Sequence, residues 1–161
     1  MSSAAAERLQ KAVTFALAAV AAFQLAAPAR AAPAVASADV AHRLASGKAV
    51  SLRDATLRGD LDLRGVARVR GSFRCLGCRL EGSLLGEDVV FERTVNLSGS
   101  RIAGRIALGG ATFEAPALFG GPSGAPASFS GRVDFKLATF EDLVSFQCFD
   151  PDGYRIEIYW E

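Results

Sequence analysis

The sequence predicts an all-β fold: a right-handed quadrilateral parallel β-helix of about four coils, preceded by a short capping helix and a helical signal peptide. Three observations lead to this prediction. From Val50 onward apolar residues occur in pairs spaced two apart, the pairs recur every five or six residues, and Gly, Ser and charged residues separate them. An α-helix repeats its apolar positions about every 3.6 residues and a long strand every two, so neither element explains the pattern.

Residues 1–31 have the layout of a secretory signal peptide. Arg8 and Lys11 form a positive region, residues 12–27 are an apolar run, and Ala29-x-Ala31 is a small-x-small cleavage site. The apolar run is shorter than a membrane span, which needs about 20 residues. We therefore expect cleavage near Ala31 and a periplasmic or secreted protein. The alternative is that the segment is not cleaved. It would then anchor the protein to a membrane.

Residues 32–49 are expected to form a linker and a capping helix. Residues 32–37 are the linker. Residues 38–48 place Val40 and Leu44 on one helical face, and Gly47 is a stop signal. An open β-coil exposes apolar side chains and unpaired strand edges at its ends. This helix is the candidate cover for the N-terminal end.

Residues 50–147 are expected to form the β-helix. Each pair, a small residue followed two later by a larger one, describes a very short strand that ends at a corner. Four such strands close a square turn, and the next turn, stacked about 4.8 Å away, buries the inward side chains. When every fourth pair stacks, the larger residues form four columns. The first column holds Leu52, Cys75, Leu97, Phe119 and Phe140, the second Leu57, Leu80, Ile102, Gly124 and Phe146, the third Leu63, Gly86, Leu108 and Phe129, and the fourth Val69, Phe91, Phe113 and Phe135.

The segment 120–128 (GGPSGAPAS) is the least regular part of the repeat. It either continues the coil or leaves it as a loop. In the first two coils the register places three arginines over three glutamates, each pair worth under about 1 kcal/mol at a surface. These pairs are Arg58 over Glu81, Arg64 over Glu87 and Arg70 over Glu92.

The repeat resembles the pentapeptide-repeat family, whose unit is a small residue, a polar residue, Leu or Phe, and two polar residues. The matching stretches are ATLRGDLDL, VNLSGSRIAG, GATFEAPALF and SGRVDFKLATFEDLVSF, within residues 50–147. The resemblance implies the square β-helix and, since members often dimerise at the C-terminal end, a homodimer formed there. Some relatives protect topoisomerases by mimicking DNA, and some long chains with a similar repeat are named membrane-associated oxidoreductases.

Residues 148–161 are expected to form a turn and a terminal strand. Asp150-Pro151-Asp152-Gly153 is a turn signal, and apolar residues alternate with polar ones over 154–160. This strand either caps its own coil or pairs with a second molecule.

The three cysteines allow several interpretations. Cys75 and Cys78 form a C-x-x-C motif at inward positions on adjoining sides, and Cys148 is alone. The pair is either two buried thiols, a structural disulfide in an oxidising compartment, or a redox-active site. A redox-active C-x-x-C motif typically lies at the N-terminus of a helix. No helix is expected at Cys75 and Cys78. Four-cysteine zinc spacing is absent from the sequence, and His42 is its single histidine.

No catalytic or cofactor-binding pattern emerges from the sequence. Asp60 and Asp62 are expected to be solvated charges, and Asn96-Leu97-Ser98 matches a glycosylation sequon. The five arginines of residues 64–79 spread over all four sides, with an anion- or lipid-headgroup-binding face as the alternative. The net charge of +1 disfavours a nucleic-acid partner. We expect a non-enzymatic structural or protein-interaction module without cofactor or metal. The alternatives are a DNA mimic or a fragment of an oxidoreductase-like repeat protein.

Overall fold

The computed structural model describes residues 32–120, 125–149 and 155–160, and beyond Phe146 it describes the backbone alone. Residues 32–161 form one compact unit. The expected signal peptide, with its cleavage site near Ala31, lies outside the described residues.

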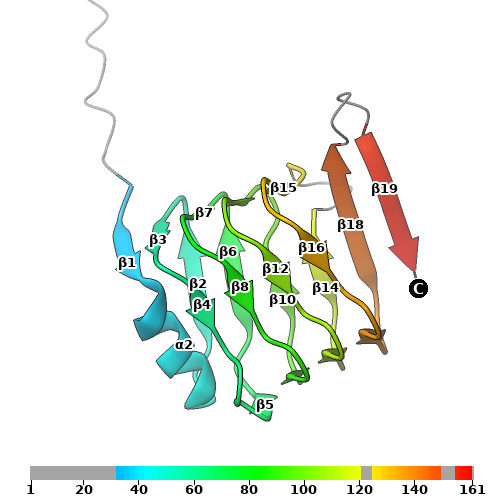
Figure 1. Cartoon of the computed structure of the whole chain (residues 1–161), viewed down its shortest axis with the longest axis horizontal. Coiled ribbons are helices and arrows are strands. Elements are labelled where there is room, and N and C mark those ends of the chain that lie inside the picture. The colour runs from blue at the N-terminus through cyan, green and yellow to red at the C-terminus, as the bar shows by residue number, and fades with distance from the viewer. Residues whose placement is uncertain (1–31, 121–124, 150–154, 161) are drawn as a thin grey trace, which may run out of the picture. The chain divides into compact units, whose positions relative to one another are not determined.

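The described chain winds as a β-solenoid whose four walls are parallel sheets (Figure 1). Four coils are complete and β18 begins a fifth, so the solenoid has about five turns when the partial ones are included. We number the walls in chain order. Wall 1 contains β2 (Val50–Arg53), β6 (Phe73–Leu76), β10 (Val95–Asn96), β14 (Ala117–Phe119) and β18 (Val144–Phe149). Wall 2 contains β1 (Ala34–Ala36), β3 (Thr56–Arg58), β7 (Arg79–Leu80), β11 (Arg101–Ile102) and β15 (Ser128–Phe129). Wall 3 contains β4 (Leu61–Asp62), β8 (Leu84–Leu85), β12 (Ile106–Ala107) and β16 (Val133–Asp134). Wall 4 contains β5 (Arg68–Val69), β9 (Val90–Phe91), β13 (Thr112–Phe113) and β17 (Thr139–Phe140).

The N-terminal helix is two residues shorter than expected, ends three residues earlier and is preceded by a strand. Helix α2 spans Ser37–Ala45, and Gly47 ends it with a φ of 73° and an amide that donates to the Leu44 carbonyl at 2.9 Å. Val40 and Leu44 are buried in the solenoid core, so the helix covers the N-terminal end of the shaft. The predicted linker was wrong in part, because β1 pairs with β3 and extends wall 2 by one strand.

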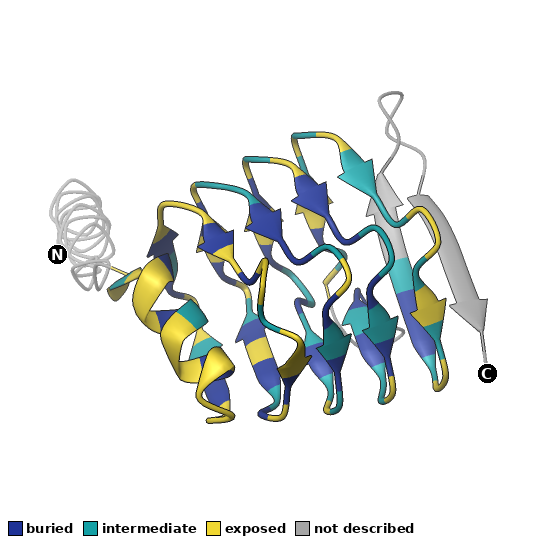
Figure 2. Ribbon diagram, turned by 60° about the horizontal axis from the view of Figure 1, so that its bottom comes forward, coloured by how far each residue is buried: buried dark blue, intermediate teal, exposed yellow. Residues whose placement is uncertain are grey.

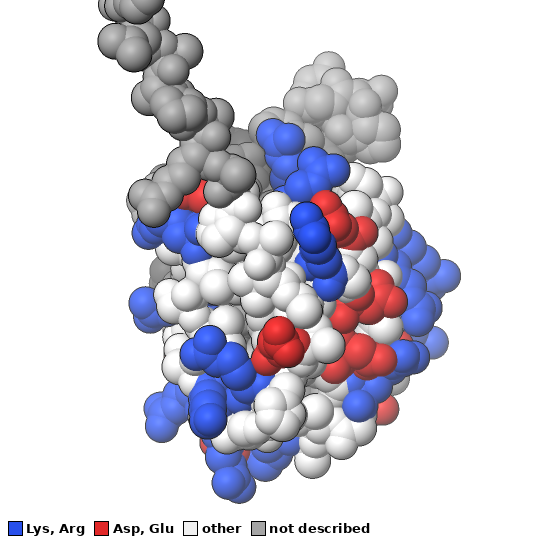
Figure 3. Space-filling model, turned by 90° about the vertical axis from the view of Figure 1, so that its left-hand side faces the viewer, with Lys and Arg blue, Asp and Glu red and all other residues white. Residues whose placement is uncertain are grey.

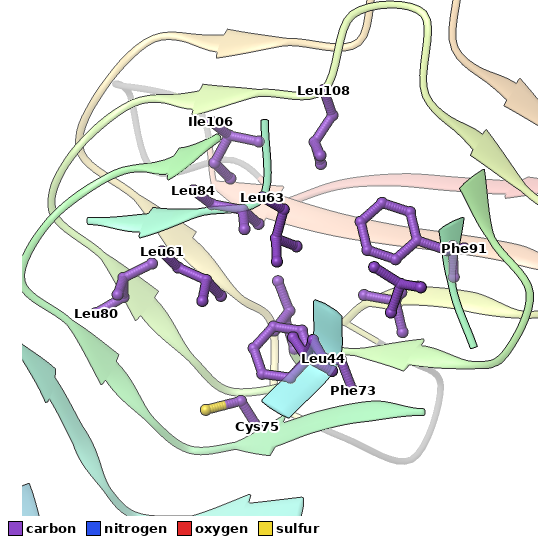
Figure 4. Close-up of a cluster of buried hydrophobic side chains, with 14 of the residues drawn as sticks. Leu44, Leu61, Leu63, Phe73, Cys75, Leu80, Leu84, Phe91, Ile106 and Leu108 are labelled. Carbon is purple, nitrogen blue, oxygen red and sulfur yellow. The ribbon is translucent and has the colours of Figure 1, made fainter. Parts of the chain in front are cut away.

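Buried positions recur along the strands of every coil (Figure 2), and their side chains meet inside the shaft (Figure 4). On wall 4 the Phe91, Phe113 and Phe140 rings stack in parallel, with centroids 4.9 Å apart at each step. All fifteen residues of the expected core ladder belong to the core or pack against it. Ten are buried: Leu57, Leu63, Val69, Leu80, Phe91, Leu97, Ile102, Leu108, Phe113 and Phe119. Five are partly buried: Leu52, Phe129, Phe135, Phe140 and Phe146.

The column register was wrong after Phe119. Wall 1 ends its described stretch at β14 with Phe119, and Phe129 lies on wall 2 as the neighbour of Ile102. The expected column had counted Gly124 as an inward position, but Gly124 lies outside the described residues. Each inward residue after Phe119 therefore lies on the wall that precedes the expected one in chain order. Phe135 lies on wall 3, Phe140 lies on wall 4 as the neighbour of Phe113, and Phe146 lies on wall 1 as the neighbour of Phe119.

Glycines stack at the corner between walls 2 and 3. This column contains Gly59, Gly82, Gly104 and Gly131, one from each coil. A methyl group on Gly104 would lie 2.6 Å from the Gly82 carbonyl group, to which the Gly104 amide donates at 3.0 Å. The corner thus leaves no room for a side chain because one backbone rests directly on the next.

We expect Gly104→Ala to lower the free energy of unfolding by about 1–3 kcal/mol, since the added methyl group meets immovable backbone. Gly109→Ala is the matched control, because its methyl group would lie in ordinary contact, 3.5 Å from the Lys136 carbonyl oxygen. The control should shift stability by roughly 1 kcal/mol or less. Urea unfolding of both variants measures this. Equal effects of the two substitutions would contradict the stacked corner.

Candidate functional site

Packed side chains of the described residues fill the interior of the shaft. One void of about 10 Å³ lies among Leu57, Cys78, Leu97, Ser100 and their neighbours. That volume is at the lower limit for a single water molecule, roughly 10–15 Å³. A ligand would therefore bind this void only by displacing core side chains, and candidate sites are to be sought on the walls and ends.

The C-x-x-C motif forms a buried corner between walls 1 and 2. The structure joins Cys75 and Cys78 by a disulfide, with their Cα atoms 5.6 Å apart and each residue 2% exposed. Ser100 of the next coil holds this corner, because its hydroxyl accepts from the Cys78 amide at 3.1 Å and donates to the Cys75 carbonyl at 2.6 Å. Such burial keeps solvent thiols from the sulfurs, as suits a structural bridge. Cys148 lies in β18, and its side chain is outside the part of the chain that the structure describes.

Ser100 is a residue whose role the sequence reasoning missed. It is buried, 2% exposed, at an inward position that apolar residues occupy in neighbouring coils. A buried hydroxyl needs hydrogen-bond partners, and the C-x-x-C corner provides them. The signal in the sequence was a serine one coil beyond a cysteine.

Ion pairs join coils on the outside of wall 4. The Arg68 guanidinium contacts the Glu92 carboxylate at 2.5 Å and the Glu114 carboxylate at 2.6 Å, so one side chain bridges three coils. The Arg68 hydrogen bond is the main reason that the pKa of Glu92 lies below its usual value. Arg70 approaches Glu92 at 3.8 Å, in the expected register. Both arginines are exposed and Glu92 is only partly buried, so each pair adds little stability.

The expected pairing of Arg64 with Glu87 was wrong. Arg64 instead binds Asp62 of its own coil at 2.6 Å, and its backbone amide also donates to that carboxylate at 3.0 Å. Both hydrogen bonds favour the ionised acid, and the pKa of Asp62 falls from 3.8 to about 2. Arg58 and Glu81 come directly after the paired residues Leu57 and Leu80 of β3 and β7. Among the described contacts they form no ion pair. Figure 3 shows mixed charge at the helix-covered end, with acidic side chains lying among basic ones.

The C-terminal end of the solenoid exposes apolar surface. Within the described chain, β19 (Arg155–Trp160) pairs antiparallel with β18 and covers wall 1, while β15, β16 and β17 are the last strands of walls 2, 3 and 4. The rings of the last coil contact one another, with the Phe129 and Phe146 centroids 5.5 Å apart, yet they are only partly buried. We call Phe129, Val133, Phe135, Leu137 and Phe140 the apolar end.

Leu137 is the most distinctive residue of the apolar end. It is 81% exposed and has a φ of 60° at the corner between walls 3 and 4. Gly65, Asp88 and Gly110 occupy the same corner of the preceding coils, also with positive φ. A leucine in this left-handed region is strained by about 1–2 kcal/mol. The fold thus holds a large apolar side chain in solvent at a position better suited to glycine.

The other expected polar residues have local structural roles or face solvent. His42 is exposed on α2, and Asp60 accepts the Ser83 amide of the next coil at 2.6 Å. The Asn96 side chain accepts the Ser98 amide at 3.0 Å and so stabilises a turn. The described residues contain no cluster of His, Cys, Asp or Glu that could hold a metal ion. No helix in the described part of the chain has the length and hydrophobicity to span a membrane.

No protein-family model, curated protein or solved structure matches the chain. The β-solenoid therefore stands on the structure, and the pentapeptide-repeat resemblance stays a prediction from the repeat.

We expect the Asp62 carboxyl to titrate near pH 2 and, in Arg64→Gln, nearer its ordinary value of 3.8. Because the folded pKa is depressed, the stabilisation is complete above the ordinary value and is lost as the pH falls towards 2. Carboxyl carbon NMR shifts measure the midpoint. Arg58→Gln should leave it unchanged. An unaltered Asp62 midpoint in Arg64→Gln would contradict the pair.

Proposed function

We propose that the chain is an exported, non-enzymatic solenoid that acts as a structural or protein-interaction module of the bacterial periplasm or cell exterior. The observation that carries the proposal is the apolar end, where a strained and exposed leucine stands beside partly buried phenylalanines. Large exposed apolar groups on an ordered surface mark interaction sites. The right-handed winding and membership of the pentapeptide-repeat family belong to the same proposal.

The partner that fits this end best is a second copy of the chain. The last strands of walls 2, 3 and 4 present backbone groups and apolar side chains as a further coil would meet them. An identical end offers the same chemistry, so two copies can bury both surfaces in one isologous contact. A homodimer formed end to end is therefore the first form of the module to test.

Export is supported by the layout of residues 1–31 and by the buried Cys75–Cys78 bridge. Disulfides persist in the periplasm and outside the cell, whereas cytosolic thiols are kept reduced. The alternative of a DNA mimic has less support, because such a protein needs a strongly acidic surface and this chain has a net charge of +1.

We expect the wild-type protein to be a dimer and Leu137→Gly to be a monomer of equal or slightly higher stability. The substitution removes the exposed side chain and also relieves the positive φ, so folding and association should respond in opposite directions. Light scattering gives the mass, and thermal unfolding at a dilution at which both are monomeric gives the stability.

Asp88→Gly is the matched control for this dimer test, since Asp88 has a φ of 58° at the same corner of an inner coil. It should leave the dimer intact. A wild-type protein that stays monomeric at high concentration would overturn the end-to-end dimer.

We expect a C-terminally tagged full-length chain, expressed in a Gram-negative host, to enter the periplasm and lose residues 1–31. Cys75 and Cys78 should resist an alkylating label before reduction and accept it after reduction and unfolding. Fractionation and mass spectrometry measure both properties. The export proposal is contradicted if the protein stays in the cytoplasm at full length and Cys75 and Cys78 are readily labelled.

A further inference from the structure

A groove of about 580 Å³ runs along the outside of wall 2. Arg79 and Arg101 lie in it on the neighbouring strands β7 and β11, where they are direct partners in the ladder. Ser128 of β15 is the next partner of Arg101, and Ser130, directly after β15, also lines the groove. All four residues are exposed, so their polar ends are free to meet a ligand.

The two residues described just before Ala127 contribute one side of the groove. Ala125 and Pro126 line it, and the Gly99 amide donates to the Ala125 carbonyl at 2.7 Å, which ties that segment to the preceding coil. Gly99 and Ala103 line the floor with little side-chain volume. Ala125 and Pro126 therefore add surface beside the two arginines.

The two arginines lack an acidic partner within the described residues. On wall 4 the charge of Arg68 is balanced by ion pairs with glutamates from the next two coils. On wall 2, neither Arg79 nor Arg101 forms an ion pair with another described side chain. Glu81 is the nearest acid in sequence, two residues beyond Arg79, but it does not line the groove. Two like charges at directly paired positions destabilise a sheet, and a bound anion would remove that cost.

We propose that this groove binds a phosphate group, which bridges the Arg79 and Arg101 guanidinium groups and accepts hydrogen bonds from the Ser128 and Ser130 hydroxyls. Guanidinium groups match the geometry of phosphate oxygens with paired hydrogen bonds, and hydroxyls complete the donor set. The volume lies in the range of small-ligand sites, about 300–1,000 Å³, so the groove also has room for the group that carries the phosphate. That carrier is either a soluble ester or a lipid headgroup.

Inorganic phosphate is the first probe, titrated into the full folded protein at constant ionic strength. We expect saturable NMR shifts centred on the Gly99, Ser128 and Ser130 amides and a rise in melting temperature. The double variant Arg79→Gln/Arg101→Gln should weaken binding by about tenfold or more, as expected for the loss of charged hydrogen bonds. Its stability without phosphate should equal or exceed that of the wild type, because the repulsion is gone.

Arg74→Gln is the matched control, because Arg74 is an exposed arginine on β6 of wall 1 and outside the groove. It should leave phosphate binding unchanged. Ser128→Ala/Ser130→Ala provides a second variant with uncharged substitutions and should also weaken binding. The proposal is overturned by unsaturable shifts, by equal losses in the Arg74 variant, or by unchanged affinity in both double variants.

Two further arms distinguish the carriers. Glycerol 3-phosphate represents soluble esters, and vesicles of phosphatidic acid in phosphatidylcholine represent lipid headgroups. Vesicle binding that the arginine double variant abolishes and free phosphate competes away assigns a lipid. Tighter binding of glycerol 3-phosphate than of inorganic phosphate, without such vesicle binding, assigns a soluble ester.

Discussion

The hydrogen bonds between successive coils are the constraint on which the rest of the structure depends. The Leu61 amide donates to the Ser83 carbonyl at 2.8 Å, and the Leu84 amide to the Arg105 carbonyl at 2.9 Å. Strands of two to four residues cannot satisfy their own backbone groups, so each coil needs its neighbours. This bonding holds the coils in register, and the register stacks the Phe rings of wall 4, the corner glycines and the ion pairs of Arg68.

The two ends of a repeat bonded in this way are covered differently. At the N-terminal end, β1 and α2 continue wall 2 and cover the shaft with Val40 and Leu44. At the C-terminal end, β19 covers wall 1 within the described chain, and the rings of Phe129, Phe135 and Phe140 remain partly exposed. The asymmetry follows from chain topology, since a helix lies across the whole opening and a strand extends a single wall. The end with less cover is where association removes the most apolar surface from water.

The regular part of the fold could be predicted from residue spacing, and the irregular part could not. Between Leu52 and Phe119 each inward residue follows the previous one by five or six positions, so counting sides assigns Phe91 and Phe113 to one wall, as the structure does. Phe129 follows Phe119 by ten positions, and spacing alone does not say whether Gly124 occupies a side. The wall 2 groove lay beyond sequence reasoning for the same reason, because spacing did not place Ala125 and Pro126 beside Arg79 and Arg101. The corner glycines, in contrast, recur once per coil and could have been found by the same counting.

The most direct test of the coil-to-coil bonding is NMR scalar coupling across the hydrogen bonds that follow the irregular segment. The structure has the Thr139 amide donating to the Ala111 carbonyl at 2.8 Å and the Glu141 amide to the Phe113 carbonyl at 2.9 Å. A coupling between the Thr139 nitrogen and the Ala111 carbonyl carbon is the predicted result. A coupling from the Asp134 nitrogen to that carbon would place Phe135 over Phe113 and contradict the register. Couplings confined to residues of the same coil would contradict the solenoid itself.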